Sequence, residues 1–235
     1  MLTKQNTPKV YRHEIKYYIS KQDAFLLSRT VSRCMQSDIH MGGSGGYWIR
    51  SLYFDNQDNR DYWGKVNGFP DRRKIRIRIY QTDTKTAKLE IKNKSGSYIL
   101  KETVEISRDD SERLLRGESS RLLCYRDQVA NRVYNYLHME RLRPVLLIDY
   151  EREAFLYPFE NIRITIDKDI RASISPHSLY DKNAIMLPVF NDERYILEIK
   201  YHTYLPYFIK KILSGLDPEL TSASKYCLAR QAVSI

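Results

Sequence analysis

The sequence has few cysteines, no long apolar run and no apolar leader. Its three cysteines, Cys34, Cys124 and Cys227, are widely spaced and form no C-x-x-C pair, which argues against a disulfide framework and indicates reduced thiols. The longest apolar runs, such as 145–148, are far shorter than the roughly 18 residues that span a bilayer. Residues 1–10 lack the apolar stretch of a signal peptide. We therefore expect a soluble, cytoplasmic protein.

Several common catalytic signatures are also missing. The Gly-rich segment 42–46 is followed by Tyr-Trp rather than Lys-Ser/Thr, so it is no phosphate-binding P-loop, and we expect a flexible connector at 41–46. The five histidines do not have the spacing of zinc ligands. No G-x-S-x-G or Cys-His signature is present. Chemistry must therefore come from another set of residues.

The composition is that of a globular protein with an excess of positive charge. Of 235 residues, 42% are hydrophobic and 29% are charged, which excludes wholesale disorder, and we predict a single domain over 1–235. The net charge of +10 favours a polyanionic partner. Nucleic acid, an acidic membrane surface and phosphate chains all fit, and composition does not choose among them.

The order of predicted elements indicates an α+β fold with a large antiparallel sheet. Alternating apolar and polar residues predict strands over 9–19, 47–54, 73–81, 87–94, 98–106, 144–152, 161–170 and 193–201. Helices are predicted after the N-cap Ser20, after Ser107 up to about 140 with a break near Gly117, and from Leu205 onward, divided at Gly215 and Pro218. Because strands occur in runs without regular βαβ alternation, the sheet is expected to be antiparallel.

The strands share one charge pattern. In 74–80 every even position is basic or polar and every odd position is Ile, so a period of two places the charges on one face. The tripeptide Glu-Ile-Lys occurs at 14–16, 90–92 and 198–200. Each strand alone is explained by a solvated outer face. Taken together, however, the charged faces of these strands are mostly positive, whereas the solvated face of a sheet usually carries charges of both signs. Solvation alone therefore does not explain the pattern.

If the sheet curls, these charged faces line a cationic channel. Its predicted basic residues are Arg12, Lys16, Arg50, Lys74, Arg76, Arg78, Lys88, Lys92, Arg152, Arg163 and Lys200, which outnumber the carboxylates Glu14, Glu90, Asp167 and Glu198. Arginine has the planar fork that suits oxyanions. The carboxylates of the Glu-x-Lys pairs could hold Mg²⁺ or Mn²⁺, since oxygen-only ligands together with substrate phosphates suit these ions.

The ordered set of motifs resembles the VTC domain, the polyphosphate polymerase domain of the triphosphate tunnel metalloenzyme (CYTH-like) superfamily. The resemblance covers about 9–230 and rests on the motifs at 14–17, 50–55, 76–78, 90–92, 150–155, 163–167, 198–200 and 224–226. It implies a closed antiparallel β-barrel tunnel of about eight strands with a charged interior, flanked by helices. Arg12 stands where the wider superfamily often has the first Glu of E-x-E-x-K, which favours phosphoryl transfer over hydrolysis.

The resemblance also implies residue roles. Catalytic roles are expected for Arg76, Arg78, Arg152, Arg163 and Lys200; phosphate binding for Lys16, Arg50, Lys92, Ser224 and Lys225; and binding of Mn²⁺ or Mg²⁺ for Glu198, with Glu14 and Glu90. Eukaryotic members append a phosphate-sensing domain and transmembrane helices, which this chain lacks, so we expect a free-standing bacterial form. A membrane partner and the oligomeric state stay open.

The expected function is transfer of the ATP γ-phosphoryl group to a growing polyphosphate chain. Two alternatives remain: a metal-dependent triphosphatase acting on inorganic triphosphate or a nucleoside triphosphate, and a polyphosphate- or RNA-binding module without turnover. Abundant Tyr could stack on single-stranded nucleic acid, but most of the 19 Tyr fall in strand patterns, where packing explains them. No nucleic acid partner is therefore expected.

Overall fold

The computed structural model describes residues 13–96 and 98–233, and for 42–44 the backbone alone. One antiparallel sheet runs through them, with the strand order β11-β1-β10-β8-β7-β3-β4-β5-β6 and with β2 and β9 paired to β7 and β8. The strands are β1 His13–Ser20, β2 Gln36–Ser37, β3 Tyr47–Asp55, β4 Arg72–Ile79, β5 Thr86–Ser95, β6 Tyr98–Ser107, β7 Arg143–Tyr157, β8 Ile162–Ser173, β9 Leu187–Pro188, β10 Arg194–Tyr201 and β11 Glu219–Leu220.

All eight predicted strands are present. β7 extends five residues beyond the predicted end at 152, and the predicted residues 9–12 lie outside the described part. The sequence did not predict β2, β9 and β11, which have two residues each and are too short to show a period. The predicted α+β class with a large antiparallel sheet is confirmed, and the single domain over 1–235 stays a prediction.

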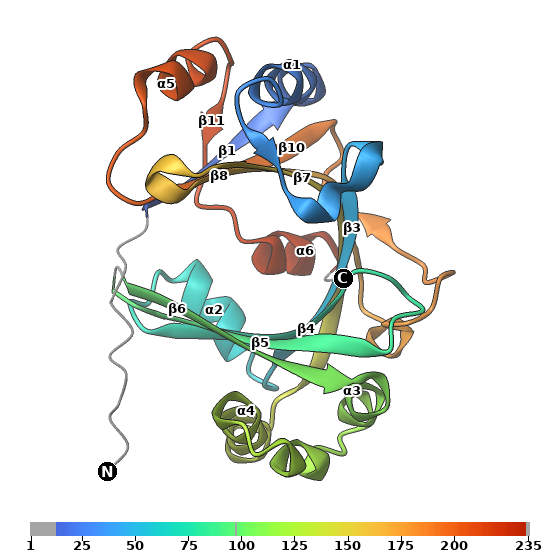
Figure 1. The fold of residues 1–235 in the computed structure, drawn as a ribbon. Helices are drawn as coiled ribbons and strands as arrows, with labels where there is room; N and C mark the ends of the chain where they lie inside the picture. Colours follow the sequence, from blue (N-terminus) through green and yellow to red (C-terminus); the bar gives the residue numbers. More distant parts are fainter. Residues whose placement is uncertain (1–12, 97, 234–235) are drawn as a thin grey trace.

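The sheet curls strongly but remains open. In Figure 1 it bends into a deep C whose two arms are formed by β1, β10 and β8 on one side and by β4, β5 and β6 on the other. The strand order ends at β11 and β6, and no backbone ladder joins these ends in the described residues, so the expected closed barrel is not formed. Side chains span the gap instead, with Lys92 Nζ 3.6 Å from Glu14 Oε2.

The helices divide between the two faces of the sheet. They are α1 Lys21–Val31, α2 Arg60–Val66, α3 Arg108–Leu115, α4 Gln128–Met139, α5 Tyr207–Leu213 and α6 Lys225–Val233, with short 3₁₀ helices η1 Ile39–Ser44, η2 Ser120–Tyr125, η3 Phe159–Asn161 and η4 Pro176–Ser178. Figure 1 shows α6 inside the curve, whereas α1 and α5 cover one arm from outside and α3 and α4 cover the other. No helix in the described ranges is long and apolar enough to cross a membrane.

Two helix starts follow the predicted caps. The Ser20 and Ser107 hydroxyls accept hydrogen bonds from Asp23 N and Asp110 N, which satisfies free amides in each first turn. The predicted break at Gly117 is also present, because this residue adopts φ +85° just after α3. The flexible connector predicted for 41–46 is wrong in its first part, since residues up to 44 belong to η1.

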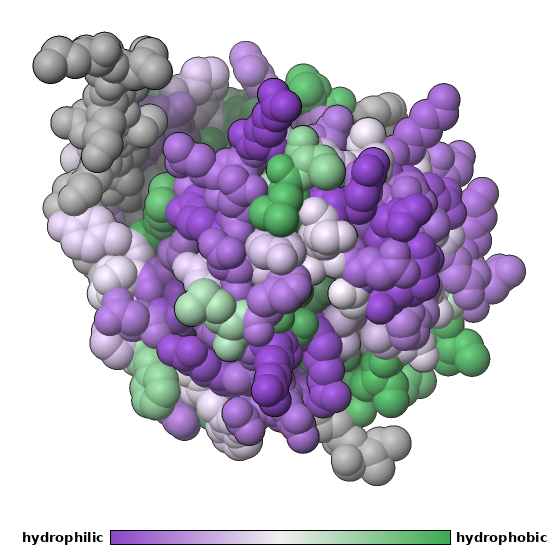
Figure 2. Space-filling view, turned by 90° about the horizontal axis from the view of Figure 1, so that it is seen from below, coloured by the Kyte–Doolittle hydropathy of each residue, from purple (hydrophilic) through white to green (hydrophobic). Residues whose placement is uncertain are grey.

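The apolar face of each strand packs outward against the helices. Ile75, Ile77 and Leu89 are fully buried beneath α3 and α4, and Ile164 and Ile199 are fully buried beneath α1 and α5. A third apolar cluster lies where α6 meets the concave face, around Ile148 and Tyr226. Figure 2 shows the outer face on the side of α3 and α4, which is mainly hydrophilic with scattered apolar patches. The apolar clusters thus occupy the outer side of the sheet and the part of the concave face that α6 covers. The remaining part of the concave face carries the charged side chains.

Candidate phosphate-binding site

The strand register brings the predicted basic residues to the concave face. Arg76 is paired with Tyr53 on one side and Glu90 on the other, and Arg78 is paired with Ser51 and Lys88. Directly paired residues share a face. The alternate residues Ile75, Ile77 and Ile79 point into the outer core. The period of two in the sequence therefore predicts this face correctly.

We call the charged part of the concave surface the cationic face. Its carboxylates are Glu14, Glu90, Asp167 and Glu198, with Asp38 at one end, and its cations are more numerous: Lys16, Lys74, Arg76, Arg78, Lys88, Lys92, Lys101, Arg152, Arg163, Lys200 and Lys225. Arg12 lies outside the described residues. The excess of one sign inside a curled sheet gives this surface a positive potential that favours an anion.

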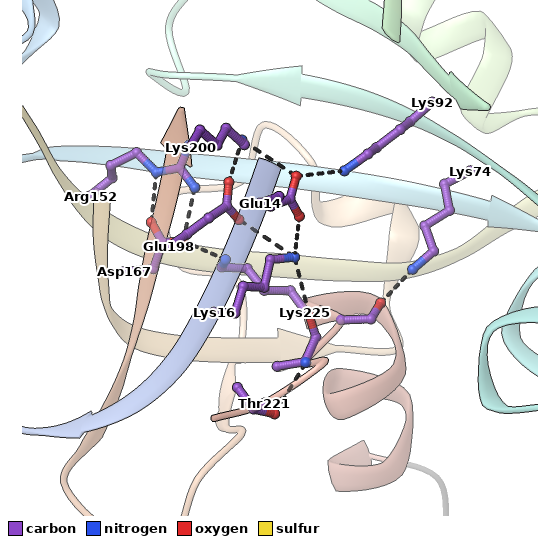
Figure 3. A network of polar contacts seen from close by, with 12 residues as sticks. Glu14, Lys16, Lys74, Lys92, Arg152, Asp167, Glu198, Lys200, Thr221 and Lys225 are labelled. Carbon is purple, nitrogen blue, oxygen red and sulfur yellow. Dashed lines mark hydrogen bonds and ion pairs between the residues drawn. The ribbon is translucent and has the colours of Figure 1, made fainter. Parts of the chain in front are cut away.

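Two carboxylates and two lysines form a compact group at β1 and β10 (Figure 3). Lys16 Nζ lies 2.8 Å from Glu14 Oε1 and 3.5 Å from Glu198 Oε2, and Lys200 contacts both carboxylates as well. Burial raises the pKa of Glu198, but Lys16 and Lys200 outweigh it and hold the pKa well below its usual range. Both carboxylates therefore stay ionised at neutral pH.

Asp167 organises the next group along the sheet. Arg152 donates a two-pronged pair of hydrogen bonds to it, Nε to Oδ1 at 2.6 Å and Nη2 to Oδ2 at 2.8 Å, and Lys225 at the start of α6 contacts Oδ2. Burial raises the pKa of Asp167, yet Arg152 and Lys225 lower it to about 2. Asp167 therefore holds the side chains of Arg152 and Lys225 in place on the concave side.

Glu90 belongs to a separate group on β4, β5 and β6. Arg76 Nε donates to Glu90 Oε2 at 2.6 Å, and Lys101 contacts Oε1. Burial opposes ionisation, but Arg76, Arg78 and Lys101 hold the pKa of Glu90 at about 2. The structure thus brings Glu14 and Glu198 together and leaves Glu90, the third predicted metal ligand, with other partners.

Arg78, which is buried, and Lys74, which is half-buried, have no carboxylate within ion-pair distance in the described part of the chain. Arg78 donates only to hydroxyls, from Nε to Ser51 Oγ at 3.2 Å and from Nη2 to Tyr150 Oη at 3.1 Å. Lys74 donates to Ser224 Oγ, and burial lowers its pKa to about 8. A buried charge without a counterion is costly. An anionic ligand would relieve that cost.

The loop before α6 and the first residue of that helix carry Ser224 and Lys225, two further predicted residues. Ser224 accepts from Lys74, Lys225 contacts Asp167, and Lys16 Nζ donates to Ala223 O at 3.3 Å. This loop therefore ties β1, β4 and β8 together across the concave side, as Figure 3 shows. Arg163 lies at the other end of the face, where Nη2 donates to Asp38 Oδ2 at 2.8 Å and to Tyr47 Oη at 3.3 Å.

Arg50 is not part of the cationic face. It is paired with Ile79 and Asp149, on the opposite side of the sheet from Arg78. There it forms a two-pronged ion pair with Asp149 and donates to carbonyl oxygens of 178, 179 and 181. Arg50 has the same parity in β3 as the buried Leu52 and Phe54, which already indicates this placement. Its expected role in phosphate binding is therefore not supported.

The sequence interpretation missed three residues of the face. The hydroxyl of Tyr53 accepts from Arg76 Nη1 at 3.0 Å, Tyr150 accepts from Arg78, and Lys101 contacts Glu90. Burial raises the pKa of Tyr53, but Arg76, Arg78 and Lys74 lower it to about 8. Residues two positions apart in a strand point to the same face. Because Tyr53 is two residues from Ser51, and Tyr150 is two residues from Arg152, the sequence could have placed both tyrosines on the cationic face.

The fit of a divalent metal depends on Glu14 and Glu198. No group of three or more His, Cys, Asp or Glu that could hold a metal occurs in the part of the chain that the structure describes. Mg²⁺ and Mn²⁺ are commonly held by one or two carboxylates together with substrate phosphates. The ionised pair Glu14 and Glu198 on the cationic face fits that donor set, whereas Glu90 does not join it.

The fold is a curled antiparallel sheet with a cationic concave face, a surface whose charge suits an oxyanion. The model of the VTC domain family matches residues 11–234, and the chain belongs to that family. This confirms the resemblance that the motifs indicate.

Solved structures with a similar fold are also known. The putative adenylyl cyclase HpAC1 from Hippeastrum, described as having a dominant triphosphatase activity, has 17% sequence identity and a TM-score of 0.59, with 94% of this chain and 96% of that chain covered. A putative adenylate cyclase from Bacillus halodurans has 13% identity and a TM-score of 0.52, with 92% and 93% covered. At these identities the likeness concerns the fold. No curated protein matches the chain.

Proposed function

We propose that this protein is a polyphosphate polymerase that transfers the γ-phosphoryl group of ATP to the end of a polyphosphate chain. The observation that carries the proposal is the pair of cations Arg78, which is buried, and Lys74, which is half-buried: in the described residues their hydrogen bonds go to hydroxyl oxygens and to no carboxylate. A phosphate chain supplies the missing negative charge. Family membership supports a triphosphate or polyphosphate ligand.

The chemistry requires positioning and charge neutralisation. An ionised terminal oxygen of the chain attacks the γ-phosphorus, the bond from that phosphorus to the β,γ-bridging oxygen breaks, and ADP leaves with the electron pair. Because the attacking oxygen is already ionised at neutral pH, no general base is needed. Arg76, Arg78, Arg152, Arg163 and Lys200 would neutralise charge on the transferring group, and Lys16, Lys92 and Lys225 would hold flanking phosphates.

Glu198 and Glu14 would hold Mn²⁺ or Mg²⁺. The ion supplies additional neutralisation of phosphate charge when it is bound. We also propose that the ligand draws the two arms of the sheet together, because Lys92 and Glu14 already meet across the gap between β5 and β1. This movement would convert the open sheet into an enclosed tunnel. The ATP donor and the three free thiols suit a cytoplasmic location.

Incubation of the protein with ATP and Mn²⁺, followed by gel electrophoresis, tests the proposal. We expect chains longer than triphosphate together with ADP. Release of orthophosphate without chain growth would instead support the second candidate, a triphosphatase, which is the activity described for the similarly folded HpAC1.

The third candidate function is a module that binds polyphosphate without turnover, and a variant of Glu198 tests it. Glu198→Gln is expected to remove metal-dependent turnover while tripolyphosphate binding and the circular dichroism spectrum stay unchanged. Glu193→Gln is the matched control and should keep full turnover, because Glu193 is exposed and, within residues 13–96 and 98–233, its ion pair is with Lys21. Binding without turnover in the wild-type protein at every metal concentration would contradict an enzymatic role.

A further inference from the structure

The cationic face continues by one more row of paired cations at the start of β4. The register of β4 and β5 pairs Arg72 with Lys94, next to the pair formed by Lys74 and Lys92. Residues two positions apart in a strand point to the same face. Arg72 and Lys94 therefore lie on the concave side of the sheet, one row beyond the cations described above.

Helix α2 adds a third cation to this row. The helix lies inside the curve of the sheet against β4 (Figure 1), and a Cβ at Gly64 would be only 3.9 Å from the Cβ of Arg72. Lys65 follows Gly64 in the last turn of α2. Burial lowers the pKa of the Lys65 ammonium, and the nearby charges of Arg72, Lys16 and Lys94 lower it further. Lys65 therefore lies close to the Arg72 and Lys94 pair.

We call Lys65, Arg72 and Lys94 the α2 cation group. All three are half-buried, and within residues 13–96 and 98–233 none of them has a carboxylate partner. Arg72 donates from Nη1 to the carbonyl oxygen of residue 69 at 2.7 Å, and the neighbouring carboxylate of Asp71 accepts from Ser95 Oγ at 2.6 Å instead. Cations held together without a counterion repel one another. A bound polyanion would relieve that repulsion.

The length of the row favours an extended ligand. From Arg78 to Arg72, the concave side of β4 presents a cation at every second residue. Six residues of a strand span roughly 20 Å. A triphosphate has three phosphorus atoms and covers only part of that length. A ligand that contacts both ends of the row must be longer and must carry negative charge along its whole length, as a linear polyphosphate does.

We propose that the α2 cation group binds phosphates of a linear polyphosphate chain beyond those that the cationic face holds. The chain would lie along β4 and leave the concave side next to α2. The inference rests on the proposed function and adds two properties to it. The chain extends toward α2, and a chain longer than triphosphate binds more tightly than triphosphate does.

Isothermal titration with two inorganic ligands tests this subsite without turnover. The ligands are tripolyphosphate and a longer linear polyphosphate of defined length, and the variant carries both Lys65→Ala and Lys94→Ala. Because each substitution removes a charge-assisted contact to phosphate, we expect the Kd of the longer chain to rise by about tenfold. The Kd of tripolyphosphate should stay within about twofold of the wild-type value, since the cationic face is unchanged.

Two further variants keep the test decisive. Lys65→Glu changes α2 alone and should weaken the longer chain selectively, even if the double variant folds poorly. Lys211→Ala, at an exposed lysine of α5 on the outside of the other arm, is the control and should affect neither ligand.

Three results would overturn the inference. They are equal affinities of the wild-type protein for the two ligands, an equal loss for both ligands in the variants, and tighter binding of a single-stranded RNA of the same charge than of the longer polyphosphate. Failure of the proposed function would appear separately, as absent chain growth by the wild-type protein with ATP and Mn²⁺.

Discussion

At the scale of single residues, the cationic face is defined by which cations have carboxylate partners and which do not. Arg152 is held by Asp167 and Arg76 by Glu90, so these arginines are positioned before a ligand arrives. In the described residues, the hydrogen bonds of Arg78 and Lys74 go to hydroxyl oxygens and to no carboxylate. Both kinds of cation favour binding of a polyanion. The side chains of Arg152 and Arg76 are already ordered, which lowers the entropic cost of binding, and Arg78 and Lys74 gain a counterion.

Replacing Arg76 tests direct participation in phosphate binding. Arg76→Ala should weaken tripolyphosphate binding by about 1–3 kcal/mol, because a charge-assisted hydrogen bond is lost. Isothermal titration measures the change, and Arg33→Ala, at an exposed arginine on another surface, is the control. Equal affinities of Arg76→Ala and the wild-type protein would remove Arg76 from the site.

The pH dependence of binding should reveal Lys74 and Tyr53. Burial lowers the pKa of Lys74 to about 8, and neighbouring cations lower the pKa of Tyr53 to about 8 despite its burial. As pH rises from 7 to 9, Lys74 loses a positive charge and Tyr53 gains a negative one, so both changes weaken anion binding.

The Kd of tripolyphosphate is measured at several pH values for the wild-type protein and for two variants. Ionisation of tripolyphosphate affects all three proteins equally, so it drops out of the comparison. Lys74→Arg and Tyr53→Phe should each flatten the decline relative to the wild-type protein. Parallel pH profiles for all three proteins would show that neither group titrates in the site.

Residue parity decided which residues could be placed on the correct face of the sheet from the sequence. Alternation along 74–80 separates cations from Ile completely, so Arg76 and Arg78 could be placed from the sequence. In β3, Arg50 has the same parity as the buried residues Leu52 and Phe54. An interpretation based on charge alone therefore placed Arg50 on the wrong face. The contacts of Glu90 with Lys101 and of Tyr150 with Arg78 depend on neighbouring strands and could not be predicted from a single strand.

At the scale of elements, α6 positions part of the site from inside the curve. Tyr226 donates to Asp55 Oδ2 at 2.6 Å, and its ring stacks on Tyr53 at 5.2 Å. Asp55 also accepts from the amides of 61 and 62 at the start of α2. This network holds the start of α6, and with it Lys225, against the cationic face.

Removal of the Tyr226 hydroxyl tests that support. Tyr226→Phe should lower the free energy of unfolding by about 1–3 kcal/mol, because a buried hydrogen bond to a carboxylate is lost. Urea denaturation measures the change. Tyr62→Phe is the control, since the Tyr62 ring packs edge-to-face on Tyr226 but its hydroxyl makes no hydrogen bond that the structure describes. Equal stabilities of Tyr226→Phe and Tyr62→Phe would contradict the role of the Asp55 contact.

The element boundaries show what local sequence can and cannot predict. Caps at Ser20 and Ser107 and a period of two are local signals, and they predicted α1, α3 and the long strands. The register shift in β7 at Asp149 and Glu151 arises from pairing with β8, so no local pattern predicts it.

At the scale of the whole molecule, curvature turns separate charged strands into one surface. The alternation in the sequence predicts that the cations share a face, and the VTC resemblance implied that this face turns inward. Both hold in the structure, whereas the implied closed barrel does not form in the described strands. Closure depends on contacts between the distant edges β11 and β6, and like charges on the facing arms oppose it until an anion is present.

Ligand binding should therefore stabilise the fold. At a concentration of tripolyphosphate one hundred times its Kd, the stabilisation is about 2.7 kcal/mol, which corresponds to a rise in Tm of roughly 5–10 °C for a chain of this size. Differential scanning fluorimetry measures the rise, with sodium chloride at equal ionic strength as the control for screening. An equal rise with chloride would show that general screening, rather than a bound chain, relieves the repulsion.

The most direct test is a crystal structure of the protein with a non-hydrolysable ATP analogue and Mn²⁺. We predict a triphosphate on the concave side, in contact with Arg76, Arg78, Arg152 and Lys200, and a metal ion at Glu198 and Glu14. Phosphates bound on the outer face, or a concave face without phosphate at a saturating concentration of the analogue, would contradict the account.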